Sequence, residues 1–255
     1  MEQRLAVGGG AVPQGVVPVG PIELWLVDLD RAPASPDDPG LTPDDRAQAG
    51  RIRDPVVSGR LLSRRLATRA IVARTMGEAP ASSLALSRTC PRCGGTDHGR
   101  PFLAGSSTEI SVSASGRLAV VAVSPRPVGV DIELWHPDIR PLPAALTAAE
   151  RRAVFVLPSG EQGPGFLRLW AAKEALLKAG GRSLADDPAS VDMAAVLTGD
   201  RVPVDDGGRT WQVRLLRLGH HHGLDPVDAD KSALVVVDAD GGDVVRREWP
   251  ERPGG

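Results

Sequence analysis

The side chains best suited to metal binding or catalysis lie in one short segment, positions 128–133, which reads VGVDIE. Asp131 and Glu133 stand two positions apart in a predicted strand, so their carboxylates point to the same face. Two carboxylates close together on one face of a strand raise each other's pKa unless a cation lies between them. Mg²⁺ prefers a few carboxylates together with water and substrate phosphates. The pair is therefore a candidate cation site, and a solvent-facing strand edge is the simpler alternative.

A predicted helix at 165–179 carries a second candidate set. Trp170, Glu174 and Lys178 are spaced i, i+4 and i+8, so their side chains share one helical stripe. Glu174 could serve there as a third metal ligand or as a general base. For this segment alone, an ordinary exposed pair of Glu174 and Lys178, which would stabilise the helix by about 0.2–0.5 kcal/mol, is the simpler explanation.

Two further segments offer ligand atoms. At 99–101 the chain reads GRP, where Arg100 presents a planar fork suited to phosphate and Pro101 stiffens the backbone; a solvated loop arginine is the alternative. Cys90, Cys93 and His98 resemble part of a zinc site, although no fourth ligand is obvious and a reduced structural loop is the alternative. The three histidines at 220–222 are interpreted as a polar turn between strands, with weak metal binding as the alternative.

In this order and spacing, the segments resemble the 4′-phosphopantetheinyl transferases of the surfactin-synthetase type. The matching text is GRP at 99–101, ISVSAS at 110–115, VGVDIE at 128–133 and WAAKEALLK at 170–178. The resemblance extends over about residues 22–240, and the combination of the last two segments makes it specific.

This resemblance implies transfer of 4′-phosphopantetheine from coenzyme A to a serine of an acyl or peptidyl carrier protein, with release of 3′,5′-ADP. The carriers would belong to polyketide, nonribosomal-peptide or fatty-acid synthesis. By motif, Asp131, Glu133 and Glu174 would hold Mg²⁺ on the pyrophosphate. Glu174 would take the proton of the carrier serine, directly or through water, and Lys178 would neutralise phosphate charge.

The resemblance also implies contacts to coenzyme A, which would involve Arg60, Arg100, Pro101, Ser113 and Lys178. The family usually reads Ser-His-Ser where this chain has Ala114 between two serines, and the missing histidine normally contacts a phosphate. Losing a charge-assisted hydrogen bond costs about 1.5–3 kcal/mol. The departure motivates a second hypothesis, a non-catalytic or repurposed protein that binds a ligand resembling coenzyme A, or a carrier protein.

Composition narrows the class of protein. The chain has 255 residues, with 30 Lys and Arg against 32 Asp and Glu, and this balance argues against a general nucleic-acid binder. Two cysteines exclude a disulfide framework, no apolar run approaches a membrane span, and the start does not read as a signal peptide. We therefore expect a cytoplasmic protein, and the resemblance implies a monomer.

The resemblance implies an α+β fold of two pseudo-symmetric halves with a cleft between them. The expected divisions are a leader at 1–20, halves at 21–125 and 126–248, and a tail at 249–255. Hydrophobic patterning predicts strands at 22–29, 109–113, 117–124, 128–134, 209–217, 232–238 and 243–247, and helices at 56–76, 147–157 and 165–179. The strands between 109 and 134 are expected to form a meander, and 88–108 an irregular loop.

The predicted helix at 56–76 is rich in arginine. Its apolar stripe leaves Arg60, Arg64, Arg65, Arg69 and Arg74 on other faces, which predicts a solvated basic surface. An acidic recognition helix of a carrier protein is expected to dock near the cleft, and part of this surface is a candidate for it.

Overall fold

The computed structural model describes residues 20–77, 84, 86–90, 93–95, 99–182, 188–219 and 224–250. Most of the predicted leader, most of the predicted tail, His98 and the three histidines at 220–222 lie outside the described residues.

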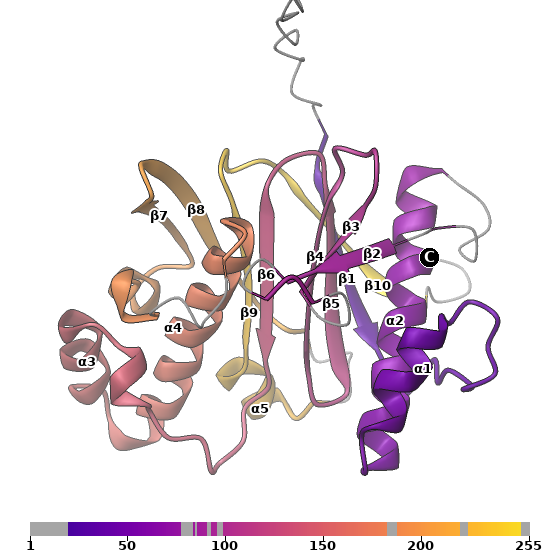
Figure 1. The fold of residues 1–255 in the computed structure, drawn as a ribbon. Coiled ribbons are helices and arrows are strands. Elements are labelled where there is room, and N and C mark those ends of the chain that lie inside the picture. Colours follow the sequence, from indigo (N-terminus) through magenta and orange to yellow (C-terminus); the bar gives the residue numbers. More distant parts are fainter. Residues whose placement is uncertain are drawn as a thin grey trace, which may run out of the picture.

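The described strands form two sheets, which confirms the α+β class (Figure 1). The first sheet has the order β10-β1-β5-β4-β3-β2, and the second has the order β6-β9-β8-β7. The strands are β1 (Ile22–Asp28), β2 (Leu86–Thr89), β3 (Arg100–Leu103), β4 (Glu109–Ser115), β5 (Leu118–Ser124), β6 (Val128–Glu133), β7 (Arg201–Asp206), β8 (Arg209–Leu216), β9 (Ala233–Asp238) and β10 (Val244–Trp249).

Two long helices lie on the outer faces of these sheets (Figure 1). The helices are α1 (Pro43–Gly50), α2 (Pro55–Met76), α3 (Ala148–Phe155), α4 (Ser159–Ala179) and α5 (Pro226–Lys231), with short 3₁₀ turns at Pro143–Ala145, Pro188–Ser190 and Ala194–Leu197. Helix α2 covers the first sheet and α4 covers the second, so the layers run α2, sheet, sheet, α4. Among the described residues, no helix has both the length and the apolar character needed to cross a membrane.

Three apolar cores fill the spaces between these layers. One lies between α2 and the first sheet, a second between the two sheets, and a third between the second sheet and α4. Val130 and Ile132 of β6 belong to the middle core. The alternate positions of β6, which include Asp131, lie on the α4 side, where Lys178 contacts Asp131.

The predicted meander is wrong at its third strand. β4 and β5 form an antiparallel pair, but β6 leaves their sheet and pairs antiparallel with β9. Pro125 and Pro127 lie between β5 and β6, and proline has no N–H to continue a sheet ladder. At the end of the described chain, β10 returns to pair parallel with β1 of the first sheet.

Two further expectations are corrected. The segment expected to be an irregular loop contains β2 and β3, which pair with each other. Helix α4 begins at Ser159 rather than near 165, and it includes Pro164. Packing overrides weak helix propensity here, because a Cβ at Gly163 would lie 2.7 Å from the Trp135 ring and one at Gly165 would lie 2.7 Å from Leu157.

The basic face of α2 is only partly solvated. Arg65 and Arg69 are buried, and their guanidinium groups lie 3.4 Å and 2.6 Å from the Asp45 carboxylate. Asp45 also completes the capping box of Thr42 at the start of α1. The prediction of a solvated face is therefore wrong for these two arginines, which cannot belong to a docking surface.

Candidate functional site

The candidate site depends on a close approach of helix α4 to strand β6. A Cβ at Gly129 would lie 1.8 Å from the carbonyl oxygen of Ala175 and 2.6 Å from the nitrogen of Ala179. Any other residue at 129 would force the helix away from the strand. The glycine thus allows the side chains of β6 and the last turns of α4 to meet.

At this contact a single ammonium group serves a group of carboxylates. Lys178 Nζ lies 2.7 Å from Asp131 Oδ1 and 3.8 Å from Glu174 Oε2, and it donates to the Val130 carbonyl at 3.3 Å. Glu133 lies two positions along β6 from Asp131. The structure therefore brings Asp131, Glu174 and Lys178 together, and Glu133 acts on the same group electrostatically. We call these four residues the carboxylate cluster.

Serines of β4 border this cluster. Ser113 Oγ donates to Asp131 Oδ1 at 2.6 Å and accepts from Lys178 Nζ at 3.3 Å, and Ser115 Oγ donates to Glu133 Oε2 at 3.2 Å. Ser111 and Ser115 also accept from the backbone N–H groups of Val130 and Leu134. Sequence reasoning singled out Ser113 but missed the other two, although three serines at every second position of a strand must share one face.

Burial and mutual repulsion raise the pKa values of all three carboxyl groups in the cluster. Burial raises the pKa of Asp131 in spite of Lys178 and Ser113. Burial, followed by the charge of Asp131, raises the pKa of Glu133 to about 7. Burial also raises the pKa of Glu174; Lys178 opposes this rise and Asp131 adds to it. One lysine therefore does not balance the three carboxylates.

The donor atoms of the cluster suit a hard divalent cation. Asp131 Oδ2 is buried without a hydrogen-bond partner, and carboxylate oxygens are the ligands that Mg²⁺ prefers. Within the described part of the chain, no three His, Cys, Asp or Glu side chains are grouped closely enough to hold a metal ion. Asp131, Glu133 and Glu174 fit Mg²⁺ by ligand type and by charge, and their joint coordination of it stays a prediction.

The segment at 99–101 holds the two sheets together beside the cluster. Gly99 has a φ of 96°, and a Cβ there would lie 2.6 Å from the Thr89 carbonyl oxygen, so only glycine fits. The Arg100 guanidinium donates to the carbonyls of Ile110 at 2.9 Å and Val128 at 3.2 Å, and it pairs with Glu109. Pro101 is buried in β3. These contacts give Arg100 a structural role, and its predicted contact to coenzyme A stays a prediction.

A cavity of about 360 Å³ lies between α2 and the β4–β5 turn. Its polar lining residues are Gln48, Arg60 and Arg64, and Ala114 and Gly116 contribute from the turn side. Arg60 makes two hydrogen bonds to Asp30, of 2.8 Å and 2.7 Å. Ala114 and Ser113 are adjacent on β4, so their side chains point to opposite faces. The cavity and the carboxylate cluster therefore lie on the two sides of one strand.

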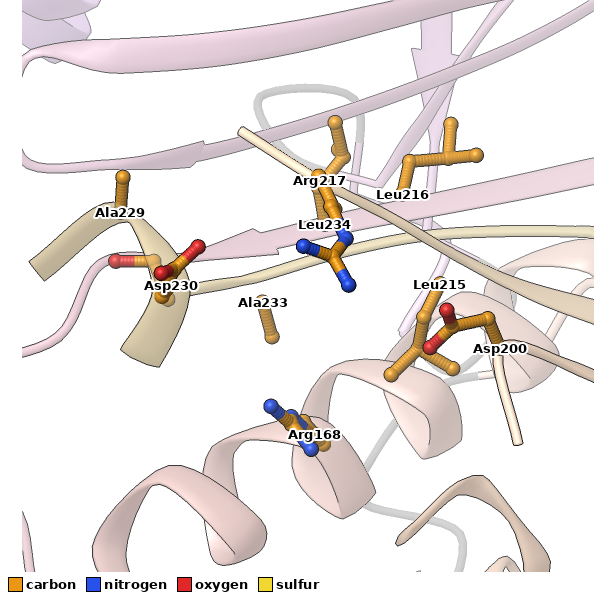
Figure 2. Close-up of a pocket in the computed structure, with 10 residues that line it drawn as sticks. Arg168, Asp200, Leu215, Leu216, Arg217, Ala229, Asp230, Ala233 and Leu234 are labelled. Atoms are coloured by element: carbon orange, nitrogen blue, oxygen red, sulfur yellow. The ribbon is translucent and has the colours of Figure 1, made fainter. Parts of the chain in front are cut away.

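A second cavity, of about 290 Å³, is formed by α4, α5, the end of β8 and the start of β9. Arg168 and Arg217 lie on opposite sides of it, and Asp200 and Asp230 also line it (Figure 2). Two arginines and two aspartates leave this cavity with no excess of either charge, and it shares no lining residue with the carboxylate cluster. Sequence reasoning gave it no role.

The cysteine pair is placed only in part. Cys90 is half-buried, Cys93 is exposed, and Cys93 Sγ accepts from the Gly95 N–H at 3.4 Å. His98 lies outside the described residues. Zinc binding by this segment therefore stays a prediction.

Sequence reasoning missed a buried ion pair on the same helix as Glu174. Lys173 Nζ lies 2.9 Å from Glu150 Oε2, and it donates to the carbonyls of Pro188 and Val191 at 2.6 Å and 2.5 Å. Glu150 also accepts from the N–H groups of Thr147 and Met193, both at 2.7 Å. The spacing of Thr147 and Glu150, which form the capping box at the start of α3, was the available signal, because a buried capping carboxylate needs a cation nearby.

Comparison with known proteins points to the same part of the chain. Residues 127–217 match the family model of the 4′-phosphopantetheinyl transferase superfamily. The matched range includes β6 and α4, and with them all four residues of the carboxylate cluster. Among curated proteins, none matches the chain.

Proposed function

We propose that this protein transfers 4′-phosphopantetheine from coenzyme A to a serine of an acyl or peptidyl carrier protein and releases 3′,5′-ADP. The observation that carries the proposal is the under-neutralised carboxylate cluster of β6 and α4, inside the range that matches the transferase superfamily. Transfer of a phosphoryl-linked group needs charge stabilisation and positioning more than covalent catalysis. Carboxylates that would hold a divalent cation next to a lysine can provide both.

Asp131, Glu133 and Glu174 are the residues that would hold Mg²⁺. When bound, the ion neutralises charge on the pyrophosphate and on the leaving group. Asp131 is the most constrained of the three, because one carboxylate oxygen is fixed by Ser113 and Lys178 while the other is buried without a hydrogen-bond partner. Ser113 and Ser115 hold Asp131 and Glu133 in place from the neighbouring strand.

In the proposed reaction the serine oxygen of the carrier bonds to the phosphorus that bears pantetheine. The bond from that phosphorus to the oxygen of the nucleotide breaks, and the electron pair leaves with 3′,5′-ADP. Glu174 accepts the serine proton, directly or through water, and its raised pKa makes it a stronger base than an exposed glutamate. Lys178 offsets negative charge that the phosphates bring to the site.

Coenzyme A is proposed to extend from the cluster around β4 toward the cavity beside α2. Arg60 lines this cavity, whereas Ser113, Arg100 and Pro101 border the junction of the sheets. Arg60 would meet a phosphate with its remaining Nη1 group, because its Nε and Nη2 groups already donate to Asp30.

The test is an intact-mass assay of apo carrier proteins with coenzyme A and Mg²⁺. We expect a gain of one phosphopantetheine, prevented by EDTA and abolished by Glu174→Gln. Glu161→Gln is the matched control, because Glu161 is an exposed carboxylate on the same helix. Undiminished transfer by Glu174→Gln would contradict its assignment as the base.

Ala114 supports a second candidate function, binding of coenzyme A or a carrier protein without transfer. It lines the α2-side cavity with a methyl group where a charged side chain would strengthen phosphate binding. Binding of coenzyme A with no mass gain on carriers from polyketide, nonribosomal-peptide and fatty-acid systems would favour this alternative.

A further inference from the structure

Strands β4 and β6 lie side by side where the two sheets meet, but they belong to different sheets (Figure 1). β4 pairs with β3 and β5, whereas β6 is an edge strand of the second sheet and pairs with β9. An edge strand has a row of N–H groups that need other partners. Ser111 Oγ of β4 accepts from the Val130 N–H at 3.0 Å, and Ser115 Oγ accepts from the N–H of Leu134, directly after β6, at 3.1 Å. Serine hydroxyls of β4 therefore join the sheets beside the carboxylate cluster.

The two serines differ in what they do with the hydroxyl hydrogen. A hydroxyl has one hydrogen to donate and two lone pairs with which to accept. The Leu134 N–H occupies one lone pair of Ser115 Oγ, and the single hydrogen is donated to Glu133 Oε2 at 3.2 Å. Within the described residues, Ser111 Oγ forms a hydrogen bond with the backbone of Val130 and with none of the three carboxylates of the cluster. Ser115 thus joins the sheets and orients a carboxylate, whereas Ser111 only joins the sheets.

Glu133 depends on a single contact for its orientation. Asp131 Oδ1 is held twice, by Ser113 at 2.6 Å and by Lys178 at 2.7 Å. In the part of the chain that the structure describes, the Ser115 hydroxyl is the only group that forms a hydrogen bond or an ion pair with the Glu133 carboxylate. A glutamate side chain has much rotamer freedom to lose when it is fixed, so without this contact its carboxylate would sample several orientations. The orientation of Glu133 toward a bound ion therefore depends on Ser115.

We propose that Ser115 is a positioning residue that holds the Glu133 carboxylate ready for a divalent cation and thereby sets the affinity of the carboxylate cluster for that cation. The inference rests on the proposed function, which assigns the cation to this cluster. A group that hydrogen-bonds to a metal ligand fixes the orientation of the ligand, and its loss typically weakens metal binding about tenfold to a hundredfold. Ser115 acts through Glu133, and its backbone contact to Leu134 keeps the hydroxyl in place.

The test is a titration with Mn²⁺, which prefers oxygen ligands as Mg²⁺ does, followed by the electron paramagnetic resonance signal of the free ion, with and without coenzyme A. We expect Ser115→Ala to bind Mn²⁺ about tenfold to a hundredfold more weakly than wild type. Ser111→Ala is the matched control, because it loses a backbone contact of the same kind on the same strand, and it should keep the wild-type affinity. Equal losses in the two variants, an unchanged affinity in Ser115→Ala, or no Mn²⁺ binding by wild type would overturn the proposal.

Two further comparisons separate positioning from a merely structural role. Ser115→Thr and Ser115→Val have nearly the same shape and differ by the hydroxyl, so they serve even if Ser115→Ala does not fold. The threonine variant should keep most of the Mn²⁺ affinity and the valine variant should lose it; equal affinities would contradict the proposal. In a double-mutant cycle, Ser115→Ala should cost no further affinity once Glu133→Gln has removed the carboxylate. A full further loss in that background would show that Ser115 does not act through Glu133.

The transfer assay separates this inference from the proposed function. Ser115→Ala should raise the Mg²⁺ concentration that gives the half-maximal rate by the factor found for Mn²⁺ affinity, while kcat at saturating Mg²⁺ stays near that of wild type. The expected Mn²⁺ pattern without any transfer would support the inference and contradict the proposed function. Transfer with an unchanged Mg²⁺ requirement in Ser115→Ala would support the proposed function and contradict the inference.

Discussion

Helix α4 carries two lysines five positions apart, and their surroundings differ sharply. Lys173 and Glu150 are both fully buried, 2.9 Å apart, and their side chains also form hydrogen bonds with backbone groups of Pro188, Val191, Thr147 and Met193. Lys178 is partly exposed and faces Asp131, Glu133 and Glu174, whose pKa values are all raised. We call the first pair closed, because its one positive and one negative charge cancel. We call the second group open, because three carboxylates face one lysine and Asp131 Oδ2 is buried without a hydrogen-bond partner among the described residues.

This difference separates residues that hold the fold from residues that can bind a ligand. A closed pair has no charge left to bind a further ion. Removing one partner leaves the other charge buried and unpaired, which destabilises the fold. An open cluster destabilises the folded protein when nothing is bound, and binding of a cation or a substrate offsets that cost. The motif WAAKEALLK therefore contains one lysine that stabilises the fold and one to which the proposed function assigns a role at the site.

The largest effect on stability is expected when a substitution breaks the closed pair. Glu150→Gln leaves Lys173 buried without an anion and should cost about 3–5 kcal/mol of unfolding free energy. Glu174→Gln removes one repelling charge and should change it by less than about 1 kcal/mol, although transfer is lost. Urea denaturation of both variants measures the contrast. Similar stability losses in the two would remove the distinction between the regions.

A second prediction concerns the approach of α4 to β6. Gly129→Ala places a methyl group against the Ala175 carbonyl and should cost about 1–3 kcal/mol, together with activity, because Lys178 moves away from Asp131. Gly160 lies on α4, and a Cβ there would have no neighbour within 4 Å. Gly160→Ala should therefore change stability by at most about 1 kcal/mol. Thermal unfolding and the transfer assay check both. A Gly129→Ala protein as stable as wild type would show that the close approach is not required.

The sequence predicted the elements whose patterns are local. The strands at 22–29 and 128–134 and the helices at 56–76 and 147–157 follow from alternation and helical spacing, and the structure contains them. The common face of Asp131 and Glu133 follows from the two-residue period of a strand. The match to the transferase superfamily covers that same segment.

What the sequence left undetermined depends on contacts between distant segments. Burial of Arg65 and Arg69 depends on Asp45, some twenty residues away, so the helix pattern alone favoured a solvated face. The move of β6 to a second sheet is decided by its pairing with β9, about a hundred residues further along the chain. The roles of Gly129 and Lys173 become visible only when α4 is packed against its neighbours.

The smallest expected effect concerns the exposed pair of Asp30 and Arg60. The hydrogen bond from Arg60 lowers the pKa of Asp30, so the unfolded chain binds this proton more readily than the folded protein does. The pair's contribution should be at most about 1 kcal/mol above the unfolded pKa of about 4, and it should disappear as pH falls through the lowered folded value. Comparing Asp30→Asn with wild type by urea denaturation at pH 7 and pH 3 tests this. A difference of the same size at pH 3 as at pH 7 would assign it to another cause.

The central claim is that the carboxylate cluster is a cation-dependent binding site for coenzyme A, and its most direct test is thermal unfolding with coenzyme A in the presence of either Mg²⁺ or EDTA. At ligand concentrations about a hundred times Kd, binding should raise the Tm by about 5–10 °C. We predict this rise with Mg²⁺ in wild type and in Glu161→Gln, and its loss with EDTA or in Asp131→Asn. An equal rise with EDTA, or an undiminished rise in Asp131→Asn, would contradict the account.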